Sequence, residues 1–218
     1  PGPCHPHAQD GVSWDDSAGY RCTAREIDEL EAATNELQAR CLDAAQHVID
    51  QNRFAEFGIP EAAVAAIRWA WENEPPAIYG RFDLIYDGRT PPRLLEYNAD
   101  TPTALIEASI AQWYWKEDVR KGTDQFNSIH EKLIAAWKKL SPKPALIHLG
   151  GVKEHLEDAQ TVLYIRDTCH QAGLETEPLF IEDVGWDAAR KKFGDLQESE
   201  GTHYFTLFPW EGRWTSDC

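Results

Sequence analysis

The side chains best suited to chemistry lie in two short stretches, residues 81–87 and 93–98, in which polar and apolar residues alternate. Successive side chains of a β-strand point to opposite faces, so every second residue shares a face. If the stretches pair as an antiparallel hairpin, one face gathers four polar side chains: Arg81, Asp83, Glu96 and Asn98. Carboxylate and amide oxygens are the ligands that Mg²⁺ takes in proteins, and a neighbouring guanidinium suits a phosphoryl oxygen. The pattern therefore predicts a magnesium site beside a phosphate-binding arginine.

The same alternation is also typical of an antiparallel sheet that has one face in water. In that interpretation the four side chains are solvated surface groups that bind nothing. Asp83 and Glu96 would be like charges on one face, which repel each other unless a cation is present. Residue spacing alone leaves both interpretations open.

The elements that must position this face are predicted from periodicity and capping signals. Thr23 followed by Glu26 is a capping-box pattern, and apolar residues then recur every three or four positions. This indicates a helix over residues 23–50. A second helix is expected at 61–74 and ends at the Pro-Pro pair that follows it. The remaining elements of this half are the hairpin turn at 88–92 and helices at 104–118 and 124–140.

A different rhythm begins after the Pro-containing stretch 141–144, which we predict to be a domain boundary. Strands alternate there with one helix, which is typical of a small parallel, Rossmann-like sheet, so the fold class is α/β. The expected order is a strand at 145–149, a helix at 157–172, and strands at 176–181 and 203–208. Gly150 and Gly151 are interpreted as a turn, and the aromatic run 113–115 as part of the core.

Charge and composition exclude several classes of protein. The chain carries 37 acidic against 21 basic residues, a net charge of −16, which disfavours nucleic acid and anionic membranes as partners. No apolar run approaches the ~20 residues of a membrane span, and the first residues lack a signal-peptide pattern, so we expect a cytoplasmic protein. Five scattered cysteines do not form a disulfide framework. Cys4, His5 and His7 could bind a metal ion, although a polar tail is the simpler interpretation.

Longer motifs around the predicted hairpin resemble the glutathionylspermidine synthase family, which are ATP-grasp-type carbon–nitrogen ligases. The resemblance is strongest in the run from Glu96 to Asp100, and it extends over residues 11–211. The stretches that carry it are 14–18, 26–31, 81–88, 94–103, 107–108, 112–113, 124–127, 157–158 and 208–211.

The resemblance implies an enzyme that uses ATP and Mg²⁺ to activate a carboxylate as an acyl phosphate, which an amine then attacks. The carboxylate belongs to a thiol peptide such as glutathione, and the amine is a polyamine such as spermidine. By motif match, Asp83, Glu96 and Asn98 hold Mg²⁺, and Arg81 stabilises the transferred phosphoryl group.

Two further pairs of residues take substrate roles through the resemblance. Thr101 and Thr103 fall where the family places hydroxyl contacts to the thiol peptide. Glu157 and Asp158 match an acidic pair that could attract the amine, although acidic residues also favour the first turn of any helix. The oligomeric state is not predicted.

The resemblance stops after Glu211, before the region in which the family carries its ATP-binding lysines and glycine-rich lid. We therefore expect the N-terminal portion of such a ligase, with an incomplete ATP-grasp-like sheet and a pre-ATP-grasp Rossmann-like unit. This portion is expected not to catalyse the ligation by itself. The alternative is a non-catalytic binding module. The expected domains are an irregular lead-in at 1–22, the helical and hairpin region at 23–141, the Rossmann-like unit at 142–211, and a divergent tail at 212–218.

Overall fold

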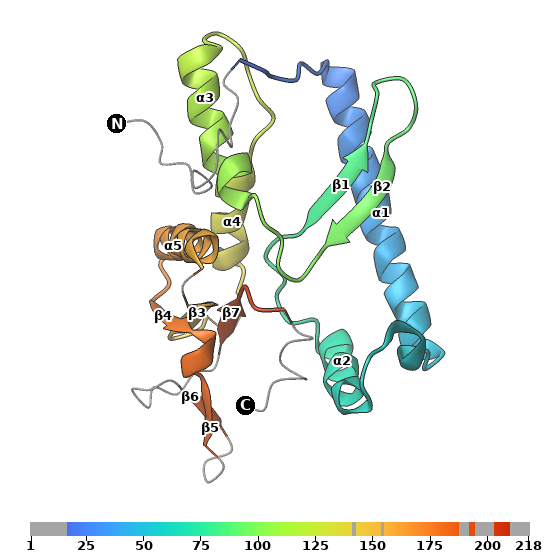
Figure 1. The fold of residues 1–218 in the computed structure, drawn as a ribbon, viewed down its shortest axis with the longest axis vertical. Coiled ribbons are helices and arrows are strands. Elements are labelled where there is room, and N and C mark those ends of the chain that lie inside the picture. The colour runs from blue at the N-terminus through green and yellow to red at the C-terminus, as the bar shows by residue number, and fades with distance from the viewer. Residues whose placement is uncertain (1–16, 141–142, 154, 188–191, 195–202, 210–218) are drawn as a thin grey trace. The chain divides into compact units, whose positions relative to one another are not determined.

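The computed structural model describes residues 17–140, 143–153, 155–187, 192–194 and 203–209 (Figure 1). Its described residues divide into two compact units, one formed by residues 20–99 and the other by residues 17–19 and 100–209. The helices between residues 100 and 140 therefore group with the parallel sheet, whereas the sequence pattern predicts that they belong with the hairpin. The domain limits stay a prediction, and the proposed Cys4, His5 and His7 cluster lies outside the described residues.

The first unit begins with the long helix α1, Ala24–Asp50, as the capping pattern predicts. The backbone N–H of Glu26 donates to Thr23 Oγ1 at 3.3 Å, and the Thr23 backbone N–H donates to Glu26 Oε2 at 2.6 Å. Together these bonds satisfy two backbone donors that the start of a helix leaves without a partner. A short 3₁₀ turn, Phe54–Phe57, and helix α2, Glu61–Asn73, complete the helical part.

The two predicted strands form an antiparallel hairpin of β1, Arg81–Ile85, and β2, Arg93–Asn98. The ring of Phe82 stacks on that of Tyr97 with a centroid distance of 4.0 Å. Helix α1 lies along this pair (Figure 1), and two tyrosine hydroxyls of the hairpin donate to its side chains. Tyr86 bonds to Glu29 at 2.6 Å and Tyr97 bonds to Gln38 at 2.7 Å. The helix thus contacts the face of the hairpin opposite to the one that carries Arg81, Asp83, Glu96 and Asn98.

The register of the hairpin shifts between Asp83 and Leu84, which the sequence did not predict. Asp83 opposes Glu96 as expected, but Leu84 opposes Leu94, so Leu95 is an extra residue in β2. Strict alternation would put Leu94 on the face of Glu96, but the bulge moves it to the opposite face. The bulge leaves Leu95 64% exposed.

The second unit opens with an irregular helix where a regular one was expected over residues 104–118. A π-helical turn, Glu107–Ala111, precedes the α-helix α3, Gln112–Val119. Two residues of the aromatic run at its start are not core, because Trp113 is 41% and Tyr114 is 55% exposed, whereas Trp115 is half-buried. Helix α4, Ile129–Lys138, begins later than the predicted residue 124, since an Asn127 side chain bonds to the Ile129 N–H at its start.

A three-stranded parallel sheet in the order β4-β3-β7 forms the rest of this unit, as the β-α-β rhythm predicts. Its elements are β3, Ile147–Gly151, helix α5, Leu156–Gln171, β4, Thr176–Phe180, and β7, Tyr204–Thr206. Gly150 and Gly151 belong to β3 and are buried, so their interpretation as a turn was wrong. A Cβ atom on Gly150 would lie only 3.2 Å from Thr206 Cγ2, which explains a glycine within the strand.

The core of this unit lies between the sheet and the helices α4 and α5. Its most buried apolar side chains are Leu149, Ile165, Cys169, Ile147, Leu133 and Trp137. A 3₁₀ turn, Ile181–Asp183, and a small hairpin of β5, Gly185–Asp187, and β6, Lys192–Gly194, were not predicted. Within the described parts of the chain, no helix is both long and apolar enough to span a membrane.

Candidate functional site

The four polar side chains of the hairpin converge on one face, as their spacing predicts. The Arg81 guanidinium forms a two-point contact with Asp83, with Nε 3.1 Å from Oδ1 and Nη2 3.0 Å from Oδ2. Its Nη2 also lies 3.9 Å from Glu96 Oε1. The Asn98 amide donates to Glu96 and approaches Asp83 Oδ2 at 3.5 Å. The side chains therefore form one connected cluster, which we call the hairpin cluster.

The hairpin cluster fits a divalent cation on charge and on donor type. Two carboxylates face one guanidinium, so the cluster keeps a net charge of −1. Like charges directly opposite each other across a hairpin destabilise it, and a cation removes that repulsion. The side chains of Asp83 and Glu96 are 37% and 59% exposed, which leaves room for the several waters that Mg²⁺ retains. Among the described residues, no three His, Cys, Asp or Glu side chains gather to hold a metal, so Asn98 would have to supply the third oxygen. Its amide nitrogen faces Glu96 and Asp83 in this structure, so the amide would have to turn over to do so.

Hydrogen bonds around the hairpin also change the ionisation of two neighbouring groups. The Glu29 carboxylate accepts the Tyr86 hydroxyl and raises the pKa of that phenol to about 12. Backbone N–H groups of Thr90 and Arg89 donate to the Asp87 carboxylate and lower its pKa. The Asp87 bonds close the turn after β1, which is why this strand ends at Ile85 and not at residue 87.

Thr101 and Thr103 lie in the short loop that leads from residue 100 into the irregular helix. Pro102 between them is buried, whereas Thr103 is exposed. Ala104 follows with a φ of 63°, a left-handed conformation that costs a residue with a side chain ~1–2 kcal/mol. Backbone strain of this kind persists only where surrounding contacts hold it, and it concentrates at functional sites.

Glu157 and Asp158 lie in the first turn of helix α5, in the same unit as the threonine loop. Asp158 is already engaged, because its Oδ1 lies 3.0 Å from His155 Nδ1 and its side chain is only 17% exposed. The same Nδ1 lies 3.3 Å from the Asp158 backbone nitrogen. When it is protonated it donates to the carboxylate, and when it is neutral it accepts this N–H and caps the helix. Glu157 is the better placed of the two for a ligand. The capping role of His155 was missed, since histidine is an uncommon residue at a helix start.

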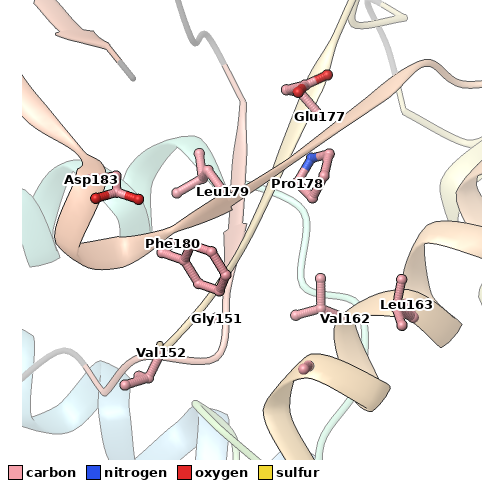
Figure 2. Close-up of a pocket in the computed structure, with 10 residues that line it drawn as sticks. Gly151, Val152, Val162, Leu163, Glu177, Pro178, Leu179, Phe180 and Asp183 are labelled. Carbon is pink, nitrogen blue, oxygen red and sulfur yellow. The ribbon is translucent and has the colours of Figure 1, made fainter. Parts of the chain in front are cut away.

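A pocket of about 390 Å³ lies along helix α5, also in the second unit (Figure 2). Figure 2 shows Val162 and Leu163 of the helix and Leu179 and Phe180 of β4 among the residues that line it. Glu177 and Asp183 bring two carboxylates to a lining that is otherwise mostly apolar. Asp183 pairs with Lys153, whose ammonium also lies 5.7 Å from the centre of the Phe180 ring. The sequence did not predict this pocket. Leu163 and Phe180 line it and are exposed, but exposure of an apolar side chain is seen only in the structure.

Comparison with known proteins links this arrangement to a family of ligases. The family model described as glutathionylspermidine synthase preATP-grasp matches residues 4–217. A protein of Haemophilus influenzae named as an acid–amine ligase is 38% identical over 203 residues, which is 91% of this chain. The bifunctional glutathionylspermidine synthetase/amidase of Escherichia coli is 34% identical over 188 residues, or 84% of this chain. The trypanothione synthetase of Crithidia fasciculata is 31% identical over 136 residues, or 60% of this chain.

The matches cover only part of each relative. The chain spans 51% of the length of the Haemophilus protein, 29% of the Escherichia protein and 21% of the Crithidia protein. All three relatives carry names of enzymes that join two molecules.

Proposed function

Because the chain belongs to the glutathionylspermidine synthase family, we propose that it serves an ATP- and Mg²⁺-dependent ligase that joins a peptide carboxylate to an amine. The observation that carries this proposal is the hairpin cluster. It combines oxygen ligands for Mg²⁺ with a guanidinium that is held by a two-point contact to Asp83. Phosphoryl transfer needs mainly positioning and charge neutralisation, and these are the groups that supply both.

The proposed reaction has two steps. A carboxylate oxygen of the peptide attacks the γ-phosphorus of ATP, the bond to ADP breaks, and an acyl phosphate forms. The amine nitrogen then attacks the carbonyl carbon, the carbon–oxygen bond to phosphate breaks, and a proton leaves the nitrogen to give the amide. Mg²⁺ would neutralise charge on the phosphate oxygens, with Asp83, Glu96 and Asn98 as its protein ligands. Arg81 lies beside them to bind the transferred phosphoryl group.

The substrates are proposed from the names of the relatives and from the residues that match. The peptide is a thiol peptide such as glutathione, bound by the hydroxyls of Thr101 and Thr103, and the exposure of Thr103 supports this. The amine is a polyamine, attracted by the half-buried Glu157 and, more weakly, by Asp158, which His155 already engages. We place the protein in the cytoplasm on its composition alone.

The finer description of the fold is part of the same proposal. The hairpin of β1 and β2 would be one segment of an ATP-grasp-type sheet. The parallel sheet β4-β3-β7 would be the core of a Rossmann-like pre-ATP-grasp unit.

The proposal is tested by titrating the chain with Mg²⁺ in a calorimeter. Asp83→Asn removes one charged ligand and is expected to weaken Mg²⁺ binding by about tenfold or more, which is ~1.4 kcal/mol. Asp28→Asn is the matched control, because Asp28 is exposed on α1 in the same unit and lies outside the hairpin cluster. Equal Mg²⁺ affinity of the two variants would contradict the metal assignment. A second titration, with glutathione, tests whether the chain binds a thiol peptide. Absence of binding would contradict the proposed peptide substrate.

A further inference from the structure

The π-helical turn at Glu107–Ala111 follows the threonine loop directly, and its geometry determines how that loop is presented. Its signature is the backbone N–H of Gln112, which donates to the Glu107 carbonyl five residues earlier. One π turn inserts an extra residue into a helix, which rotates everything before it by ~100° relative to everything after it. Residues 101–106 are therefore oriented differently from how a regular α-helix would orient them.

One side chain from elsewhere in the unit holds this turn. The Asn127 amide donates to the carbonyl oxygens of Ala108 and Ser109 at 2.9 and 3.1 Å. Its Oδ1 accepts the Ile129 backbone N–H at 3.2 Å, so the amide is attached to the π turn at one end and to the start of α4 at the other. Asn127 is half-buried, where its hydrogen bonds gain strength from partial exclusion of water.

A second set of contacts holds the same turn from within the unit. Ser109 is buried, and its hydroxyl donates to the Leu105 carbonyl at 2.6 Å. Within the same unit, the Tyr164 hydroxyl of α5 lies 3.1 Å from His130 Nδ1 of α4. The turn is thus tied to the start of α4 through Asn127, and the left-handed Ala104 lies just before it.

We infer that Asn127 is a positioning residue for the threonine loop: it holds the π turn, and through that turn it sets the orientation of Thr101 and Thr103. This inference rests on the proposed function in one respect, the contact of those hydroxyls with a thiol peptide. It adds a role for the stretch 124–127, to which the resemblance assigns none. Without the Asn127 bonds, the helix would relax toward α geometry and shift the loop by one residue.

The experiment uses Asn127→Asp, which removes the two donated bonds and keeps the oxygen that accepts the Ile129 N–H. Amide hydrogen exchange of residues 101–111 should become faster in this variant, whereas exchange of α5 residues 160–171 should not. The affinity for glutathione, measured by calorimetry, should fall by about tenfold, as expected for two lost hydrogen bonds.

Two controls separate positioning from general destabilisation. Asn73→Asp removes an amide bond of the same kind, to the Trp69 carbonyl at 2.8 Å, in the other unit, and should leave glutathione binding unchanged. Leu133→Ala opens the core beneath α4, where Leu133 is 3% exposed, and should lower stability without weakening binding at low temperature. If Asn127→Asp does not fold, Asn127→Ala, which also removes the two donated bonds, replaces it in both measurements.

The possible outcomes distinguish this inference from the proposed function. Unchanged exchange of residues 101–111 in Asn127→Asp would overturn the role of Asn127, whatever the chain binds. Wild-type affinity for glutathione in that variant, or equal losses in Leu133→Ala, would overturn it as well. A wild-type chain that binds no glutathione would overturn the proposed peptide, while the exchange measurement would still decide whether Asn127 holds the turn.

Discussion

Replacing Asn98 by aspartate should have opposite effects on the hairpin cluster in the absence and in the presence of Mg²⁺. The wild-type amide donates to Glu96 and approaches Asp83 Oδ2 at 3.5 Å. In N98D a carboxylate oxygen takes the place of the amide nitrogen, so two favourable contacts become two repulsive ones. The Arg81 guanidinium then has to compensate three carboxylates in place of two.

The magnitude follows from the distance. Two unit charges 3.5 Å apart repel by ~1.2 kcal/mol in a water-like dielectric, so two such contacts cost ~2.4 kcal/mol before salt is considered. The side chains of Asp83 and Glu96 are 37% and 59% exposed, so dissolved salt screens them and reduces this value to about 1–2 kcal/mol. A bound divalent cation relieves the same repulsion, so the affinity of N98D for Mg²⁺ should rise by about 5- to 30-fold.

The assay is urea unfolding followed by tryptophan fluorescence, once with EDTA and once with Mg²⁺, together with calorimetric titration of Mg²⁺. N98D should be less stable than the wild type in EDTA and should regain that loss with Mg²⁺. Asn35→Asp is the control, because Asn35 is exposed on α1 in the same unit and its replacement adds the same charge away from the cluster. Full stability of N98D in EDTA, or Mg²⁺ binding no tighter than in the wild type, would refute the reasoning.

Two further predictions concern stability in each unit. The Tyr86 pKa is raised from 10.0 to about 12 by the Glu29 carboxylate, so this bond stabilises the fold below about pH 10 and is lost as pH rises toward 12. The wild type should therefore have a higher melting temperature than Tyr86→Phe near pH 10, and this difference should disappear as the pH approaches 12. Tyr114→Phe, at an exposed position, is the control and should melt at the same temperature as the wild type throughout. In the second unit, Thr168→Val leaves the buried Trp137 indole N–H without its acceptor at 3.0 Å and should cost about 1–3 kcal/mol in urea unfolding. Thr168→Ser keeps the hydroxyl and should recover most of that loss; equal losses in both variants would show that packing, and not the hydrogen bond, is responsible.

Patterns within a few neighbouring residues were sufficient to predict much of this protein. The capping box at Thr23 and Glu26 needs residues only three positions apart, and the structure confirms both of its bonds. The alternation in residues 81–87 and 93–98 predicts the hairpin and the convergence of its polar side chains for the same reason. The β-α-β order after residue 144 likewise predicts a parallel sheet, because short connections leave few other topologies.

Tertiary contacts decided the rest, because the deciding partners are far apart in the chain. The bulge after Asp83 depends on how β1 pairs with β2 and moves Leu94 to the other face, although no residue in either strand signals it. Burial of Gly150 within β3 depends on Thr206, more than fifty residues later. The π turn depends on Asn127, whose amide reaches a carbonyl 19 residues earlier. Sequence thus determined which groups the chain can bring to a site, whereas long-range packing determined how they are oriented.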